Sequence, residues 1–300
     1  MICNLAEKND TRSGSIVLIS IAIFVFGLVA VGQNSITASR LQPLPAQTLD
    51  SKLMHRKMAY RIIVPPTYDE KSSQRYPVIY LLHGLTGHYN NWTDKTKVEE
   101  YDLPLGFIIV TPEGGDGWYT DSLTIPNDKY ESYIIQELIP EIDAKFRTMA
   151  DRDHRAIAGL SMGGYGAVKF GLKYPDRFSL VGSFSGVMDA TALDDKVGGQ
   201  VGASTVPVFG TKSSEIRREN DIFVIARSMT TEQVSKLPFI YASCGVDDPY
   251  YKGNRTFSAL LQMKKVPHEF RELPGNHNWV FWDDQVREFL ALADRILKKR

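Results

Sequence analysis

Short apolar runs alternate with longer helical patterns over most of this chain. Runs rich in β-branched and aromatic residues predict strands at residues 58–66, 76–84, 107–113, 154–160, 178–186, 239–245 and 268–273. Helical periodicity predicts helices at residues 130–146, 162–174, 255–265 and 279–299. Such alternation is typical of βαβ units, and several strands are apolar throughout, as doubly covered strands are. We therefore expect an α/β protein with a mostly parallel, twisted sheet and helices on both faces.

Composition narrows the class of protein further. The 300 residues are 43% hydrophobic and 23% charged, which fits a globular protein and excludes disordered, collagen-like and coiled-coil chains. The 35 basic residues balance the 35 acidic ones, so no overall field attracts a polyanion and no nucleic-acid partner is expected. Two cysteines, Cys3 and Cys244, are too few for a disulfide framework.

An uncharged apolar run stands near the amino terminus. Residues 16–31 read IVLISIAIFVFGLVAV. A membrane-spanning helix needs about 20 apolar residues and a signal-peptide core about 7 to 15, so the run falls between these two classes. Ala30 and Gly32 supply small residues that favour cleavage before Gln33. Residues 1–32 are therefore interpreted as a signal peptide or, alternatively, as an uncleaved membrane anchor.

The segment after this run has no periodicity. Residues 33–47 contain two prolines and are interpreted as a tether, and the folded domain is expected to span residues 48–300. The protein is then secreted or periplasmic, or anchored in a membrane with its domain facing outside the cytoplasm. A membrane is an expected partner only if the amino-terminal segment is uncleaved, and the sequence does not determine an oligomeric state.

The alternation of strands and helices stops between the strands predicted at 178–186 and 239–245. The intervening stretch, about 188–237, holds the Gly-rich sequence VGGQVGAS and short helical patterns around SEIRREND and TTEQVSKL. A connection this long is usually functional. We expect an insertion over the carboxyl edge of the sheet that forms part of a substrate wall; a surface excursion without function is the alternative.

A serine stands between two glycines at the junction of a predicted strand and a predicted helix. The sequence Gly159-Leu160-Ser161-Met162-Gly163 has the pattern G-x-S-x-G. In this strand–turn–helix context the pattern forms a tight turn that presents the serine hydroxyl at the start of the helix. The helix dipole favours negative charge that develops nearby. Ser161 is therefore the predicted nucleophile of a serine hydrolase.

A serine nucleophile needs an adjacent base, most often a histidine held in one tautomer by a carboxylate. On the α/β-hydrolase fold, which the serine motif indicates, the chain order is serine, acid, histidine. Of the six histidines, only His268 and His277 follow Ser161 late enough. His268 opens a predicted strand, whereas His277 lies in the loop PGNHNW before the last helix. His277 is therefore the predicted base.

Two adjacent carboxylates compete for the role of the acid. Asp247 and Asp248 follow the predicted strand FIYASCG, in a loop at the carboxyl end of that strand. Neighbouring side chains point to different sides at such a transition, so only one of them can reach the histidine. Spacing alone does not select between them.

Acyl transfer to serine passes through a tetrahedral oxyanion, which preorganised backbone N–H groups stabilise. Met162, directly after the predicted nucleophile, supplies the first N–H. The second is expected from the sequence HGLTG after the strand YPVIYLL, and Leu85 is the predicted donor. His83 and Gly84 of the same loop are candidate cleft residues. For His83 a structural role in binding the loop is favoured over proton transfer.

Together, several segments carry a family resemblance. They are HGLTGHYNNW, PEGGDGWYTDS, GLSMGGYGAVKFGLKYPDRF, CGVDDPYY and PGNHNWVFW. In this order they resemble the esterase branch of the α/β-hydrolases, which includes tributyrin esterases, feruloyl esterases, S-formylglutathione hydrolases and mycolyltransferases. The resemblance spans roughly residues 55–295, and the motif sequences are most similar to those of the tributyrin and feruloyl types. The export signal departs from the S-formylglutathione hydrolases, which are cytosolic enzymes.

The resemblance implies an α/β-hydrolase fold with an insertion over the active site. It selects Asp248 as the acid, because the family's acid lies three residues after the glycine of its CGxxD motif, which is Gly245 here. It also places Trp118 and Tyr119 beside the cleft. Cys244, by contrast, is interpreted as a small buried strand residue.

The implied activity is hydrolysis of carboxylic esters through an acyl-enzyme, with short-chain acyl or feruloyl-type esters as substrates. The expected partner is a small-molecule, carbohydrate or lipid ester. Two alternatives remain open at this stage: an acyltransferase that moves the acyl group to a sugar or lipid alcohol, and a catalytically silent binding protein on the same fold. No metal or organic cofactor is expected, since the sequence has no HExxH, no spaced Cys/His cluster and no P-loop.

Overall fold

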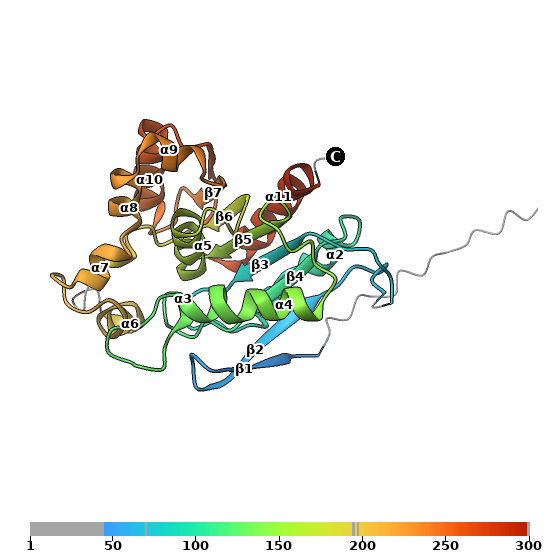
Figure 1. Cartoon of the computed structure of the whole chain (residues 1–300). Coiled ribbons are helices and arrows are strands. Elements are labelled where there is room, and N and C mark those ends of the chain that lie inside the picture. The colour runs from blue at the N-terminus through green and yellow to red at the C-terminus, as the bar shows by residue number, and fades with distance from the viewer. Residues whose placement is uncertain (1–44, 70, 194–195, 197, 299–300) are drawn as a thin grey trace, which may run out of the picture. The chain divides into compact units, whose positions relative to one another are not determined.

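One eight-stranded sheet organises the fold (Figure 1). The computed structural model describes residues 45–69, 71–193, 196 and 198–298. The strand order is β1-β2-β4-β3-β5-β6-β7-β8. β1 and β2 pair antiparallel at one edge and β2 is antiparallel to β4, whereas every pair from β4 to β8 is parallel. The strands are β1 Gln47–Ser51, β2 Arg56–Ile63, β3 Val78–Leu82, β4 Ile108–Pro112, β5 Arg155–Leu160, β6 Leu180–Phe184, β7 Phe239–Gly245 and β8 His268–Leu273.

The central strands are apolar on both faces because a hydrophobic cluster lies on each side of the sheet. In β3, Tyr80 and Leu82 belong to one cluster, and Ile79 and Leu81 belong to the other. All of these side chains are fully buried. Since successive side chains of a strand point to opposite faces, a continuous apolar run is stable only where helices cover both faces.

Helices supply the two covers. The cluster around Tyr80 includes residues of α5, α4, α10 and α8, whereas the opposite cluster includes α1, α2 and α11. Apolar residues recur along α11 at helical spacing, which buries one stripe of this long helix against the sheet. The helices outside the insertion are α1 Asn91–Lys95, α2 Val98–Asp102, α3 Tyr130–Ser132, α4 Ile139–Lys145, α5 Met162–Lys173, α10 Tyr251–Met263 and α11 Trp279–Leu297.

Pro140 lies in the helix predicted at 130–146, where a kink or a fresh helix start was expected. The structure joins α3 to α4 through a π-helical segment, η1 Tyr133–Leu138, and Pro140 stands in the first turn of α4. Proline has no N–H to donate and crowds the preceding turn, and a wider π-helical turn relieves both problems. The helical path therefore continues past Pro140 with a change of winding.

The segments predicted as strands all contain an observed strand, with ends that differ by up to a few residues. The sequence analysis missed β1, an edge strand in which exposed and buried residues alternate weakly. It also missed the short helices α1 and α2, which are each one turn long and carry little periodicity. The expected α/β architecture, a mostly parallel sheet with helices on both faces, is confirmed.

The stretch expected as an insertion folds into short helices. They are η2 Ala190–Ala192, α6 Gly199–Phe209, α7 Glu215–Glu219, α8 Ile222–Ser228 and α9 Thr231–Ser235. The helices α7, α8 and α9 are capped by the side chains of Ser214, Asp221 and Thr230, respectively. Each of these side chains accepts a hydrogen bond from a backbone N–H in the first turn of its helix. The Gly-rich sequence largely falls within α6, a helix that its glycines did not predict. Figure 1 shows these helices grouped together, apart from α4 and α11.

The signal peptide or anchor expected at residues 1–32, and nearly all of the tether at 33–47, lie outside the described residues. Over the part of the chain that the structure describes, no helix combines the length and apolar character that crossing a membrane requires. The first described strand begins at Gln47, close to the expected start of the folded domain at residue 48.

Candidate active site

Ser161 lies on a strained turn between β5 and α5. Its backbone φ is +53°, in the left-handed region that a non-glycine residue rarely adopts. The turn is held by two backbone bonds, from Ser161 N–H to Phe184 O at 3.0 Å and from Val187 N–H to Ser161 O at 3.2 Å. A strained residue fixed in this way presents its side chain at the carboxyl end of the parallel strands, at the amino end of α5.

The two glycines that flank the serine motif are required by close backbone packing. A Cβ atom at Gly159 would lie 2.5 Å from the backbone of Gly163, and a Cβ atom at Gly163 would lie 2.4 Å from Leu82 O. Gly163 belongs to α5 and Leu82 to β3, so neither backbone can move aside without displacing that helix or strand. The motif therefore exists because α5 must start directly against β5 and β3.

His277 lies in the loop between β8 and α11 and reaches Ser161. Its Nε2 atom is 2.9 Å from Ser161 Oγ, across 116 positions of sequence. Tyr250 and Trp282 flank the imidazole edge to face, with ring centroids at 5.0 and 4.9 Å. These two aromatic residues were not singled out in the sequence, because nothing in their local pattern marks contact with a residue in another loop.

Asp248 is the carboxylate that meets His277. Its Oδ2 atom is 2.9 Å from His277 Nδ1, and its Oδ1 atom accepts a hydrogen bond from Tyr250 N–H at 2.8 Å. Asp248 is 5% exposed, whereas Asp247 is exposed and points away. The turn after β7 therefore separates the two neighbouring side chains.

The environment of Asp248 favours its charged form. Burial acts to raise the pKa of this carboxyl, but the hydrogen bonds from His277 and from Tyr250 N–H outweigh burial and hold the pKa below its usual range. An ionised Asp248 accepts from Nδ1 of the imidazole. Nε2 is then left free to accept the proton of Ser161.

Two backbone N–H groups are available beside Ser161. Met162 is the first residue of α5, so its N–H has no partner within that helix. Among the described residues, the N–H of Leu85 has no recorded acceptor. The loop of Leu85 lies against the nucleophile, since a Cβ atom at Gly84 would stand 3.3 Å from Ser161 Cβ. Leu85 and Met162 are therefore the candidate donors to an oxyanion on this serine.

The remaining candidate cleft residues are buried. His83, Trp118 and Tyr119 are 0 to 1% exposed, and Gly84 is buried as well. Trp118 Nε1–H donates to Ser204 Oγ of α6 at 2.9 Å, and Tyr119 O–H donates to His83 O at 3.0 Å. Trp118 and Tyr119, which the resemblance places beside the cleft, are buried in the core of this structure and hold neighbouring loops together.

A charged residue that the sequence analysis did not single out lies inside this core. Lys169 of α5 is fully buried and pairs with Glu131 at 2.8 Å. Its ammonium also donates to Tyr119 O at 2.7 Å, Thr120 Oγ1 at 2.6 Å and Asn220 Oδ1 at 3.2 Å. It therefore joins α5 to the loop behind the cleft and to the insertion. The helical pattern predicted only that position 169 lies on a helix.

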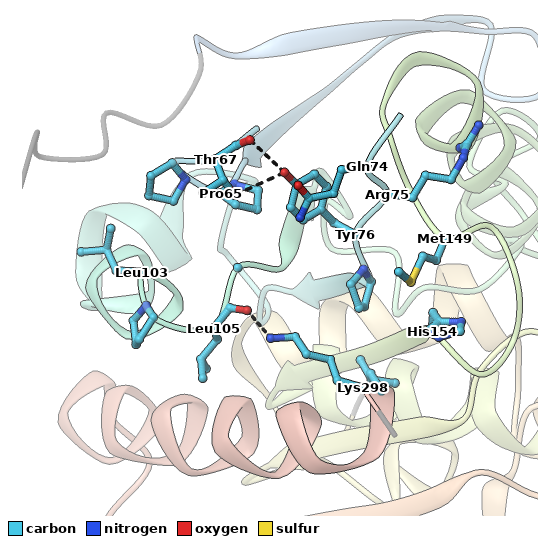
Figure 2. A pocket seen from close by; sticks show the side chains of 15 residues that line it. Pro65, Thr67, Gln74, Arg75, Tyr76, Leu103, Leu105, Met149, His154 and Lys298 are labelled. Carbon is cyan, nitrogen blue, oxygen red and sulfur yellow. Dashed lines mark hydrogen bonds between the residues drawn. The ribbon is translucent and has the colours of Figure 1, made fainter. Parts of the chain in front are cut away.

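A pocket of about 510 Å³ lies far from this serine along the strands (Figure 2). Its lining includes Pro77, Gly106 and His154, each of which directly or closely precedes a parallel strand. Ser161, by contrast, follows the carboxyl end of β5. The pocket is therefore at the opposite edge of the sheet from the candidate active site.

Cys244 is a fully buried residue of β7. Burial raises the pKa of the Cys244 thiol to about 12, which makes it a poor nucleophile. Across the described ranges, no group of three or more His, Cys, Asp and Glu side chains is arranged to hold a metal ion.

Comparison with known proteins gives a consistent result. A family profile described as "Putative esterase" matches residues 51–292. An acetyl esterase of Caldicellulosiruptor saccharolyticus is 26% identical over 257 residues, which cover 79% of this chain and 92% of that protein. An esterase of Mycobacterium tuberculosis is 31% identical over 246 residues, 75% of this chain; the match spans only 53% of that relative's length.

Solved structures agree with the sequence relatives. A ferulic acid esterase structure superposes with a TM-score of 0.72 at 30% identity, over 84% of this chain and 98% of that chain. The family match, residues 51–292, spans the segments that carry Ser161, Asp248 and His277.

Proposed function

We propose the roles of individual residues from the premise that this chain is an ester-hydrolysing serine hydrolase with the α/β-hydrolase fold. The chain belongs to the esterase family whose profile matches residues 51–292. Ser161 is the nucleophile, His277 the general base and Asp248 the residue that orients the imidazole. The observation that carries this proposal is the continuous chain Ser161 Oγ–His277 Nε2–His277 Nδ1–Asp248 Oδ2, with 2.9 Å at both hydrogen bonds.

Acylation follows from this chain of contacts. Ser161 Oγ attacks the ester carbonyl carbon while its proton passes to Nε2 of His277, and the carbonyl electron pair moves to oxygen. The tetrahedral intermediate collapses when the imidazolium returns the proton to the alkoxy leaving group. The alcohol departs, and the acyl group remains bound to Ser161.

Deacylation repeats the sequence with water. Nε2 accepts a proton from the attacking water, a second tetrahedral intermediate forms, and its collapse returns that proton to Ser161 Oγ as the carboxylic acid leaves. The edge-to-face contacts of Tyr250 and Trp282 hold the imidazole in one plane through both steps.

Leu85 and Met162 stabilise the oxyanion in both steps. Their N–H groups belong to backbone segments fixed against Ser161, so they need little reorganisation when charge appears on the carbonyl oxygen. Removal of one such donor typically costs about 100- to 1000-fold in kcat. The amino end of α5 adds a favourable dipole at the same point.

Short-chain acyl esters and feruloyl-type esters are the proposed substrates. The printed names of the relatives, an acetyl esterase and a ferulic acid esterase, support this class. We also propose that the enzyme acts outside the cytoplasm, after export or while anchored in a membrane. The uncharged apolar run at residues 16–31 supports that location.

A panel of p-nitrophenyl acyl esters together with methyl ferulate tests the function on the wild type and on Ser161→Ala. We expect turnover of short acyl chains and of methyl ferulate, and a loss of at least about 1000-fold in Ser161→Ala, with oxyanion stabilisation accounting for the residual rate. A burst of p-nitrophenol from the wild type would report the acyl-enzyme. A Ser161→Ala variant with near-native turnover would reject the assignment.

A further inference from the structure

The direction of the Leu85 N–H, one of the two proposed oxyanion donors, depends on the carbonyl group of Gly84, which takes no part in the reaction. Gly84 O accepts two hydrogen bonds, from His83 Nδ1–H at 2.7 Å and from Gly87 N–H at 3.0 Å. A trans peptide is planar and its C=O and N–H point in opposite directions. Holding Gly84 O on one side therefore aims the N–H of Leu85 to the other side, where Ser161 lies.

The ring of His83 has only one way to make these contacts. A carbonyl oxygen can only accept, so Nδ1 of His83 carries a proton. Nε2 is 2.8 Å from Gly114 N–H and accepts from it. The ring is fully buried, so water cannot replace either partner. His83 therefore connects the loop of Leu85 to the turn after β4 through two backbone groups.

A carboxylate reinforces that connection. Glu113 Oε1 accepts from Gly115 N–H at 2.9 Å, while Oε2 accepts from Tyr89 N–H at 3.2 Å. Oε1 also lies 3.3 Å from His83 Nε2, but this nitrogen accepts from Gly114 N–H and has no proton to give to the carboxylate, so that contact is not a hydrogen bond. Glu113 Oε2 also faces His88 Nδ1 at 3.4 Å. These bonds hold the turn after β4 and the loop of Leu85 in one arrangement around the His83 ring.

We propose, resting on the function proposed above, that His83 is a positioning residue of the oxyanion hole: its Nδ1–H bond to Gly84 O fixes and polarises the Gly84–Leu85 peptide so that the Leu85 N–H faces the developing oxyanion. A hydrogen bond accepted at the oxygen of a peptide strengthens the donor at its nitrogen. His83 itself touches neither the substrate nor the reacting atoms.

Two substitutions separate this role from a merely structural one. In His83→Asn the amide nitrogen can take the position of Nδ1 and keep the donor to Gly84 O, but no group remains at Nε2. In His83→Gln the amide can take the position of Nε2 and keep the acceptor for Gly114 N–H, but the donor to Gly84 O is lost. His88→Gln is the matched control, because His88 faces the same Glu113 but is largely exposed and makes no recorded contact with Gly84.

Steady-state kinetics with p-nitrophenyl acetate give the first readout. Because the Leu85 N–H is loosened rather than removed, we expect His83→Gln to lose about 10- to 100-fold in kcat with KM changed by less than about threefold. Affinity for a trifluoromethyl ketone, which forms an oxyanion on Ser161, should fall in parallel. His83→Asn and His88→Gln should stay within about fivefold of the wild type.

Other results would overturn the proposal. His83→Gln at the wild-type rate would do so, as would a His83→Asn variant impaired as much as His83→Gln, because the bond to Gly114 would then be the important one. If the variants fail to fold, the wild-type protein still provides a test. ¹⁵N NMR of its labelled histidines should show that Nδ1 of His83 is protonated. An unprotonated Nδ1 would refute the proposal. An inactive wild type would instead refute the proposed function.

Discussion

The catalytic edge and the insertion are positioned by different kinds of interaction. At the catalytic edge, Ser161, Asp248 and His277 each stand in a short loop at the carboxyl end of a parallel strand. Strand register and backbone hydrogen bonds fix these loops, such as Ser161 N–H to Phe184 O at 3.0 Å. The proposed catalytic residues are therefore attached directly to the strands of the sheet.

The insertion is instead held largely by side chains. Phe209 and Ile222 are buried in the core, and two backbone bonds, from Leu123 N–H to Val208 O and from Thr124 N–H to Pro207 O, add to its polar contacts. Gln200 donates to Asp116, which accepts Thr86 N–H, and Tyr165 O–H donates to Asn220 O at 2.7 Å. No strand runs through the described part of the insertion. The comparison teaches that the proposed triad depends on the sheet, whereas the insertion depends mostly on side-chain contacts and can differ without loss of the triad residues.

The largest effect is expected at the catalytic edge, from Asp248→Asn. Unlike a carboxylate, the amide can donate to Nδ1, which places the imidazole proton on Nε2 and prevents that atom from accepting the proton of Ser161, so kcat should fall by about 10,000-fold. Kinetics with p-nitrophenyl acetate measure it. The neighbouring Asp247→Asn is the control and should stay within about twofold. Equal losses in both variants would contradict the assignment of the acid.

The Lys169→Met substitution should destabilise the junction between the sheet and the insertion. This change leaves Glu131 with fewer cationic partners and removes donors to Tyr119 O and Asn220 Oδ1. Breaking a buried pair in this way should lower the free energy of unfolding by about 3 to 5 kcal/mol, measured by denaturant titration.

Lys173→Met is the matched control for that prediction. Lys173 lies one turn further along α5 and pairs with the same Glu131, but its side chain is partly exposed. Its loss should cost less than about 1 kcal/mol. If the two variants are equally stable, the buried ammonium does not hold the insertion to the sheet.

The same pair predicts how stability depends on pH. Burial acts to raise the pKa of Glu131, but Lys169 and Lys173 outweigh it and lower the pKa to about 2. Because the unfolded carboxyl binds protons near pH 4.5, the stabilisation is complete above that pH and is lost as the pH falls toward 2, by up to about 3 kcal/mol. Thermal melts across this range measure it.

Two variants sharpen the pH test. Glu131→Gln removes the titrating group and should flatten the fall of the melting temperature between pH 4.5 and 2. Glu141→Gln removes a half-buried carboxylate that pairs with Lys145, and should keep the wild-type slope. A Glu131→Gln variant with an unchanged slope would assign the acid sensitivity to other carboxyls.

The smallest effect is expected within the insertion, from Gln200→Ala. Gln200 is exposed and its bond to Asp116 Oδ2, at 2.6 Å, contributes at most about 1 kcal/mol. We expect KM for methyl ferulate to rise by less than about fivefold while kcat for p-nitrophenyl acetate is unchanged. Glu215→Ala, at a surface ion pair of α7, is the control. A large loss of kcat would show that the insertion supports the triad itself.

Much of the fold and of the candidate site could be predicted because the signals are local. The apolar runs predict the doubly covered strands, and the glycines beside Ser161 predict a turn with no room for side chains. His277 followed from chain order together with its place in the loop before the last helix. The edge strand β1, the helix α6 and the buried Lys169 could not be predicted, because their stability comes from partners distant in sequence.

The sequence by itself determined the order of strands and helices, the nucleophile turn and the type of each catalytic side chain, since these depend on periodicity and on residues within one turn. Spacing left the choice between Asp247 and Asp248 open, the family resemblance selected Asp248, and the tertiary structure brings Asp248 to His277. Only the tertiary structure decided that Trp118 and Tyr119 are buried in the core and how His83 holds the loop of Leu85. The reason is physical: each outcome depends on the direction of a side chain or peptide relative to a segment far away in sequence, and packing the sheet sets that direction.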